Sequence, residues 1–101
     1  MPTLMLTYRV AEEGVAEVVD AITDTVAELA AAGPEGVRYA YLRAAGGTEF
    51  VALLTLEEGV ENPLPGLPAG QRLQAAVAKW SVDGPPAPRP FDVLGAHRLF
   101  G

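Results

Sequence analysis

His97, three tyrosines, Trp80 and several arginines are the side chains of this chain whose types suit binding or catalysis. Histidine is the side-chain type that changes charge near neutral pH, and His97 is the only one in the sequence. It suits a general base or a haem ligand, or a plain hydrogen bond at a sheet edge or between two subunits. Because no acid stands at a spacing that would pair with it, we favour the hydrogen bond.

The aromatic residues are the second group with possible chemistry. Tyr8, Tyr39 and Tyr41 fall in strand-like runs that we expect on neighbouring strands, and Trp80 ends a helical stretch. Such side chains suit a pocket that binds a flat ligand or donates a phenol proton, although at core spacing they more often simply pack, and we favour packing. If a ligand pocket exists, we expect its lining to come from Thr7, Arg9, Tyr39, Tyr41, Trp80 and His97.

Charged and sulfur-containing groups suggest no further site. Arginines in strand-like runs, such as Arg9 and Arg43, suit an anionic ligand but equally suit cross-strand pairs with Glu49 or Glu57. No glycine run matches a phosphate-binding loop, and one histidine with scattered carboxylates predicts no metal site. The chain has no cysteine, which excludes thiolate chemistry and fits a cytoplasmic protein.

Composition narrows the class of protein. With 101 residues, half of them apolar, we expect a single domain over residues 1–101. The net charge of −6 argues against nucleic acid as a partner, because nucleic-acid binding needs a basic surface. No apolar run approaches the roughly 18 residues of a membrane helix, so we expect no membrane association. The first residues run directly into a strand pattern, so we expect no signal peptide.

Hydrophobic periodicity predicts the elements that position these side chains. A long amphipathic helix ends at Gly33-Pro34, a turn joins the second strand to the third, and a proline-rich loop precedes the last strand, which would carry His97. The order is that of the ferredoxin-like α+β fold, a four-stranded antiparallel sheet with two helices on one face. The predicted strands are 3–10, 37–44, 49–57 and 91–100, and the predicted helices are 12–32 and 69–80.

Two helices cover only one face of a four-stranded sheet. The other face would expose Met5, with Val51 or Leu54 and apolar residues of the second strand, depending on the register. Leaving such a surface in water forgoes about 25 cal/mol for each Å² of possible burial. A second copy packed face to face would cover it, so the sequence predicts a homodimer.

The chain resembles the dimeric α+β barrel proteins, in particular the antibiotic biosynthesis monooxygenase-like group. The resemblance rests on the short first strand at Leu4–Val10, the long helix, the run Gly33-Pro34-Glu35-Gly36-Val37-Arg38-Tyr39, and the third strand from Phe50 to Glu58. It implies that two ferredoxin-like units pair into a dimeric barrel. It also implies a choice of chemistry, because the group contains cofactor-free quinone-forming oxygenases and haem-degrading enzymes.

The haem-degrading members carry an asparagine on the first strand, a tryptophan on the second helix and a histidine after it. By that resemblance, Thr7 takes the place of the asparagine, Trp80 lies at the end of its helix and His97 falls on the last strand. Threonine lacks the amide, and a strand side chain points out of the sheet, so we predict no haem and no other cofactor.

Two functions remain open from the sequence. The first is a homodimeric protein that binds a hydrophobic or aromatic small molecule or serves as an assembly module. The alternative, which the resemblance suggests, is a cofactor-independent monooxygenase-like enzyme acting on an aromatic, polyketide-type substrate. Polar groups converging in a pocket would favour the enzyme, whereas an apolar cavity without a titrating group would favour binding.

Overall fold

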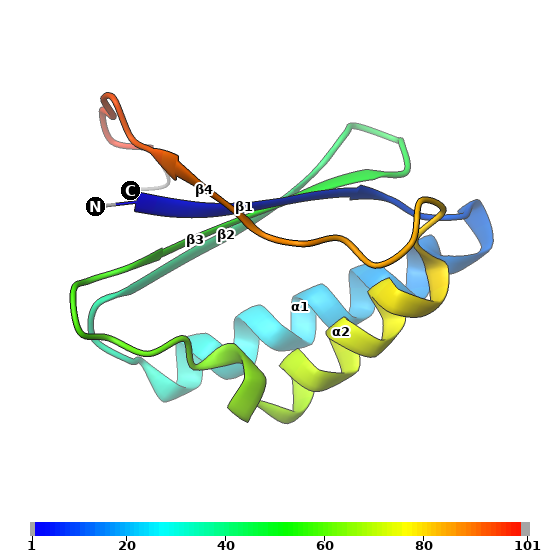
Figure 1. The fold of residues 1–101 in the computed structure, drawn as a ribbon. Coiled ribbons are helices and arrows are strands. Elements are labelled where there is room, and N and C mark those ends of the chain that lie inside the picture. The colour runs from blue at the N-terminus through cyan, green and yellow to red at the C-terminus, as the bar shows by residue number, and fades with distance from the viewer. Residues whose placement is uncertain (1, 100–101) are drawn as a thin grey trace.

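The computed structural model describes residues 2–99, and its ribbon shows one sheet lying above two helices (Figure 1). The four strands are antiparallel in the order β2-β3-β1-β4. This is the ferredoxin-like α+β arrangement predicted from the sequence. The strands are β1 (Pro2–Arg9), β2 (Val37–Arg43), β3 (Glu49–Leu56) and β4 (Arg89–Asp92), the helices are α1 (Val15–Ala32) and α2 (Pro68–Trp80), and the short 3-10 helices are η1 (Glu12–Gly14) and η2 (Leu64–Gly66).

Helix α1 forms as the sequence predicts, because its apolar residues recur at helical spacing and its acids lie on the opposite side. Val18 and Thr25 are almost completely buried, and the Thr25 hydroxyl donates to the Ala21 carbonyl one turn earlier, at 2.7 Å. The helix ends at Gly33, which adopts the left-handed conformation (φ 55°) and donates its N–H to the Leu29 carbonyl. Pro34 then prevents further helix.

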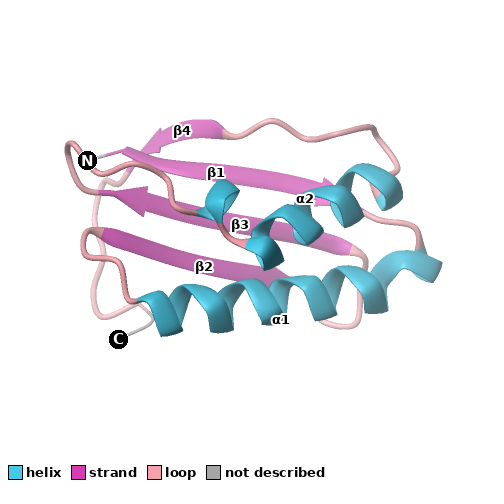
Figure 2. Ribbon diagram, turned by 90° about the horizontal axis from the view of Figure 1, so that it is seen from below, coloured by secondary structure: helices cyan, strands magenta, loops and turns pink. Residues whose placement is uncertain are grey.

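The two helices lie side by side beneath one face of the sheet (Figure 2). Small buried residues, Ala21, Ala69 and Ala76, belong to the core where the helices pack. The carboxylate of Glu28 on α1 accepts from the Ala69 N–H in the first turn of α2, at 3.2 Å. An acceptor at this end of a helix also interacts favourably with the helix dipole.

The strand register places alternate residues on two different faces. On the covered face, under which the helices pack, Tyr39 lies opposite Leu54, and Leu54 lies opposite Leu4. On the other side, which we call the open face, Leu53 lies opposite Met5. The apolar residues that this register assigns to the open face are Met5, Ala40, Leu42, Val51, Leu53 and Phe91.

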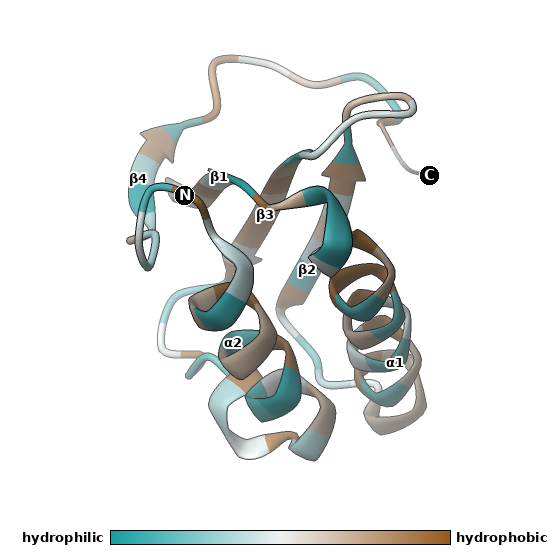
Figure 3. Ribbon diagram, turned by 90° about the vertical axis from the view of Figure 1, so that its right-hand side faces the viewer, coloured by the Kyte–Doolittle hydropathy of each residue, from teal (hydrophilic) through white to brown (hydrophobic). Residues whose placement is uncertain are grey.

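The last strand differs from the prediction. It spans Arg89–Asp92 instead of residues 91–100, and it pairs with β1 up to the contact between Asp92 and Pro2. The predicted extension is wrong because β1 begins at Pro2, so later residues have no part of β1 opposite them. Residues 93–99 are exposed, Leu94 completely so, and the chain passes above the open face (Figure 3). The predicted residue 100 lies outside the described residues.

Candidate ligand pocket

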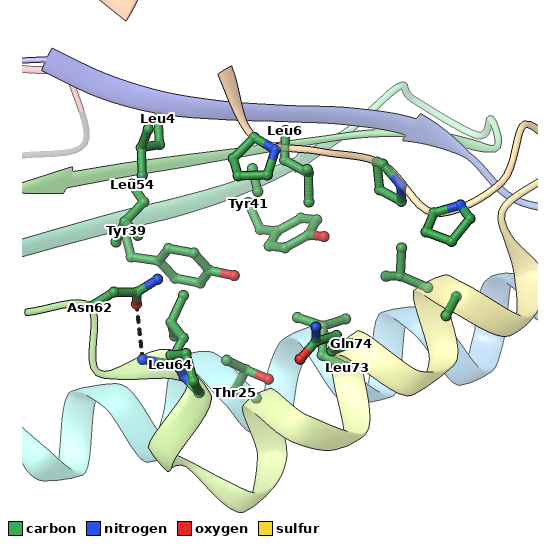
Figure 4. A pocket seen from close by; sticks show the side chains of 18 residues that line it. Leu4, Leu6, Thr25, Tyr39, Tyr41, Leu54, Asn62, Leu64, Leu73 and Gln74 are labelled. Carbon is green, nitrogen blue, oxygen red and sulfur yellow. Dashed lines mark hydrogen bonds between the residues drawn. The ribbon is translucent and has the colours of Figure 1, made fainter. Parts of the chain in front are cut away.

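A cavity of about 350 Å³ lies between the covered face of the sheet, helix α2 and the segments on either side of that helix (Figure 4). The sheet bounds the cavity on one side, and α2 with Thr25 of α1 bounds it on the opposite side. Its rim includes residues of η2 and of the proline-rich segment before β4. The volume falls at the lower end of the range for small-molecule sites. The sheet residues that line it are Leu4, Leu6, Tyr39, Tyr41, Ala52 and Leu54.

The residue sizes on the covered face explain why the hollow is there. Across the three main strands, Tyr41 lies opposite Ala52, and Ala52 lies opposite Leu6. The small alanine at the centre of this row leaves room between two larger neighbours. One row further along, Phe50 stands at the same central position, is 1% exposed and fills the space between the sheet and the helices.

A close backbone approach shapes the rim. A methyl group added at Gly70 in the first turns of α2 would lie 2.3 Å from the Leu64 carbonyl oxygen. Only glycine therefore lets η2 come so near to α2. Next to this contact, the Asn62 side chain accepts from the Leu64 N–H at 3.0 Å and so fixes the turn that leads into η2. On the opposite rim, the cavity is bounded by Pro85, Pro86 and Pro88.

The phenol groups give the cavity its polarity. The hydroxyls of Tyr8 and Tyr41 are hydrogen-bonded to each other, and either one is able to donate. The rings of Tyr39 and Tyr41 meet edge to face with centroids 5.9 Å apart. In Figure 4 the hydroxyls of Tyr39 and Tyr41 both point into the cavity. Among residues 2–99, no side-chain hydrogen bond involves the Tyr39 hydroxyl, so it is available to a bound molecule.

All three phenols stay protonated at neutral pH. Burial raises the pKa of Tyr8 from 10.0 to about 12, and the hydrogen bond with Tyr41 opposes part of that rise. Burial also raises the pKa of Tyr39 and of Tyr41 well above the usual tyrosine value, with the neighbouring phenols adding to the effect. The pocket therefore offers neutral hydroxyls, which act as hydrogen-bond donors and not as bases.

Two of the six residues predicted to line a pocket do so, namely Tyr39 and Tyr41. Thr7 and Arg9 lie on the open face instead, because odd-numbered residues of β1 point away from the helices. Both are exposed, and Arg9 lies 3.7 Å from the Asp83 carboxylate. Whether Thr7 and Tyr39 lie on the same face of the sheet depends on how the strands are paired, and the sequence alone does not give that register.

Trp80 and His97 also lie outside this lining. Trp80 ends α2 and packs so closely beneath Gly14 that a methyl group there would lie 2.2 Å from its ring. Its indole N–H is buried without a hydrogen-bond partner among residues 2–99. His97 is exposed in the segment after β4, because the strand predicted to carry it ends at Asp92.

The sequence does not predict the contact between the Tyr8 and Tyr41 hydroxyls. The two residues were expected on neighbouring strands, but β3 lies between β1 and β2, so that expectation is wrong. Tyr8 lies opposite Phe50 and Tyr41 lies opposite Ala52, and the two hydroxyls reach each other across β3 on the covered face. Most of the remaining lining was missed because it comes from loops and from helix residues whose facing side the sequence leaves open. These residues include Thr25, Asn62, Leu64, Gln74 and three prolines.

The described residues contain no cluster of three or more His, Cys, Asp or Glu side chains that would hold a metal ion. Neither helix in the described part is long and apolar enough to cross a membrane. A search of the sequence against models of known protein families finds no match, and no curated protein matches it either.

Proposed function

We propose that this chain is a homodimeric protein that binds a hydrophobic or aromatic small molecule in the pocket beneath the sheet. The observation that carries the proposal is the cavity itself, at about 350 Å³, with an apolar lining and a few convergent polar groups. Such a combination is typical of small-molecule sites. Well-packed interiors have few voids larger than a water molecule, so a space of this size marks a region that is not simply core.

The lining favours binding over catalysis. Its polar side chains are Thr25, Tyr39, Tyr41, Asn62 and Gln74, and none of these described residues is a carboxylate or an imidazole. The cofactor-independent monooxygenase-like reaction, the alternative, would begin by removing a proton from an aromatic substrate. Protonated phenols with raised pKa values do not serve as the base for that step.

Binding is tested by titration with N-phenyl-1-naphthylamine, an uncharged flat dye whose fluorescence rises in apolar surroundings. We expect saturable binding that is weakened at least about ten-fold by Ala78→Leu, because Ala78 lines the cavity and its enlargement occupies space there. Ala27→Leu, on the exposed side of α1, is the matched control and should leave the titration unchanged. No saturation, or equal binding by both variants, would overturn the pocket.

The open face supports the homodimer. Leu42 and Phe91 remain 40% and 39% exposed, and Met5, Val51 and Leu53 are only partly buried although they lie mid-strand. A second copy is the occupant that an apolar patch on a self-complementary sheet favours, since one two-fold axis covers both patches at once. The acids of α1 lie on the far side of the helices, so their charge does not oppose this pairing. The resemblance to dimeric α+β barrel proteins supports the same arrangement.

The dimer is tested by light scattering on a sizing column. We expect twice the mass of the 10.6 kDa chain for the unaltered protein and for Ala27→Lys, which adds a charge to an exposed helix position. Leu53→Lys adds the same charge at the centre of the open face and should give the monomer mass, because a buried unpaired charge is costly. A monomeric unaltered protein at micromolar concentration would contradict the homodimer.

A further inference from the structure

The pocket has hydrogen-bonding groups but no charge in its described lining. Its polar side chains are two phenols, two amides and one hydroxyl, and the Thr25 hydroxyl is already used within α1. Transferring an ionised group into such surroundings is unfavourable unless an opposite charge pairs with it. Arg72 and Asp24, which lie 3.4 Å apart, are more than half exposed, and neither lines the pocket.

Tyr8 is placed to control the direction of the Tyr41 hydroxyl. Its ring is 7% exposed and stacks on Phe50 with centroids 5.5 Å apart and an interplanar angle of 13°. Tyr8 does not line the cavity, and its hydroxyl bonds to that of Tyr41. When Tyr8 donates, the proton of Tyr41 is left to point into the cavity. A hydroxyl that accepts one bond while donating another donates more strongly.

Tyr39 supplies a second donor on the same strand. The Tyr39 and Tyr41 side chains come from the same face of β2, and their hydroxyls enter the cavity on the same side (Figure 4). A carbonyl oxygen has two lone pairs and accepts two such bonds at once. Leu4, Leu54 and Leu73 on the other walls offer apolar contact to the body of a ligand.

We propose that the ligand of this pocket is an uncharged flat molecule with a ketone-type acceptor, which bonds to the Tyr41 hydroxyl while Tyr8 orients that hydroxyl. This inference rests on the proposed binding function and narrows the ligand class. Tyr41 is the binding residue, and Tyr8 is a positioning residue that acts through it. An anionic molecule of the same shape is disfavoured because no cation lies among the described residues of the lining, and a hydrocarbon of the same shape leaves the Tyr39 hydroxyl without an acceptor.

The experiment compares three compounds of nearly equal size by calorimetry at neutral pH: 2-acetonaphthone, 2-ethylnaphthalene and 2-naphthoate. They present a ketone, a hydrocarbon and a carboxylate on the same ring system. We expect the ketone to bind about five-fold to ten-fold more tightly than the hydrocarbon, as one net hydrogen bond predicts, and the carboxylate to bind most weakly. Equal binding of ketone and hydrocarbon, or tightest binding of the carboxylate, would overturn the inference while leaving the pocket intact.

The tyrosine variants assign the roles. Tyr41→Phe should abolish the ketone preference, and Tyr8→Phe should reduce it while the affinity for 2-ethylnaphthalene stays unchanged in both. The ratio of the affinities for 2-acetonaphthone and 2-ethylnaphthalene is measured within each variant, so a general loss of stability does not produce the same result. An unchanged ratio in Tyr8→Phe would overturn the positioning role. No saturable binding of any of the three compounds to the unaltered protein would instead overturn the proposed binding function, and this inference with it.

Discussion

The covered face of the sheet has two ends with opposite character, although the same three strands and two helices form both. At the packed end, Phe50, Val18, Tyr8 and Val10 are buried in one continuous core. At the hollow end, the strands and α2 enclose the cavity. Because elements and layers are shared, the difference arises from side-chain size at equivalent positions of the sheet.

The decisive position is the middle strand. Phe50 fills the packed end, and two residues later Ala52 leaves the hollow end open, with both side chains pointing toward the helices. A fold of this size has little spare stability, since single domains are stable by only about 5–15 kcal/mol. A protein that keeps a hollow here must therefore obtain its stability at the other end, which divides the covered face into a closely packed part and a hollow part.

The largest effect that we expect is the loss of Phe50. Phe50→Ala should lower the free energy of unfolding by about 3–5 kcal/mol, because it removes a completely buried ring from close packing. Leu54→Ala, on the same strand and the same face, should cost about 2 kcal/mol, the lower limit for such a change, since Leu54 already borders the cavity. Urea denaturation measures both values. Equal losses would mean that the two ends do not differ in packing.

Gly14 offers a second way to test the packed end. Gly14→Ala should cost about 1–3 kcal/mol, because the added methyl group would lie 2.2 Å from the Trp80 ring and must displace it. Gly66→Ala, at the end of η2, is the matched control, because a methyl group there meets nothing within 4 Å. Gly66→Ala should leave the free energy of unfolding nearly unchanged. Thermal denaturation of the two variants checks the difference, and a neutral Gly14→Ala would show that the indole moves without cost.

The fold of this chain was predictable because the hydrophobic periodicity and the glycine and proline residues that end the elements indicate the same boundaries. The α1 helix was predicted over 12–32 and begins at Val15 after a 3-10 turn, and the first three strands lie within one residue of their predicted bounds. Only the last strand was placed badly. Alternation of apolar residues continued to residue 100, but the length of a strand depends on its partner, and the described pairing of β4 with β1 ends at Asp92 and Pro2.

The pocket was predictable only in part. Tyr39 and Tyr41 stood out because aromatic residues on one side of a strand share a face, and β2 indeed places both in the cavity. Thr7 was assigned to the same site because nothing in a single sequence fixes which face of β1 meets the helices. The hollow itself depends on one alanine, Ala52, and small residues in strands carry no signal that separates a cavity from ordinary close packing.

Alkaline pH should destabilise the protein, because the buried Tyr8 at the packed end and Tyr39 and Tyr41 at the hollow end ionise. Burial raises the pKa of Tyr8 from 10.0 to about 12, and those of Tyr39 and Tyr41 rise as well. The folded state therefore favours the neutral phenols, so this stabilisation is complete below pH 10 and is lost as the pH rises through the folded-state pKa values. At pH 10 each of the three phenols would be about half ionised in the unfolded chain but not in the folded one. This should lower the free energy of unfolding by about 1 kcal/mol, no more than the lower limit expected for Gly14→Ala.

Absorbance at the tyrosinate band, followed together with circular dichroism, measures this effect. We expect ionisation to lag behind that of free tyrosine and to accelerate when the chain unfolds. Tyr41→Phe should narrow the lag, since it removes one buried phenol and the hydrogen bond that it shares with Tyr8. Ionisation of all three phenols near pH 10 in the folded protein would contradict the buried hydroxyl pair.

The smallest effect should come from the ion pairs between the helices, which lie beside both ends. Lys79 lies 3.6 Å from Glu17 near the packed end, and Arg72 lies 3.4 Å from Asp24 near the hollow end. These side chains are about half exposed or more, so each pair should contribute only about 0.2–1 kcal/mol. Lys79→Met and Arg72→Met should therefore lower the free energy of unfolding by similarly small amounts, further reduced at 1 M salt. Lys79 also lies over the Trp80 ring, 4.9 Å from its centroid, and Arg72 also lies 3.9 Å from the Glu28 carboxylate, so each side chain has a second partner and the two losses should be similar. If instead either variant cost as much as Phe50→Ala, charge between the helices, and not side-chain size on β3, would be what separates the stable end from the hollow one.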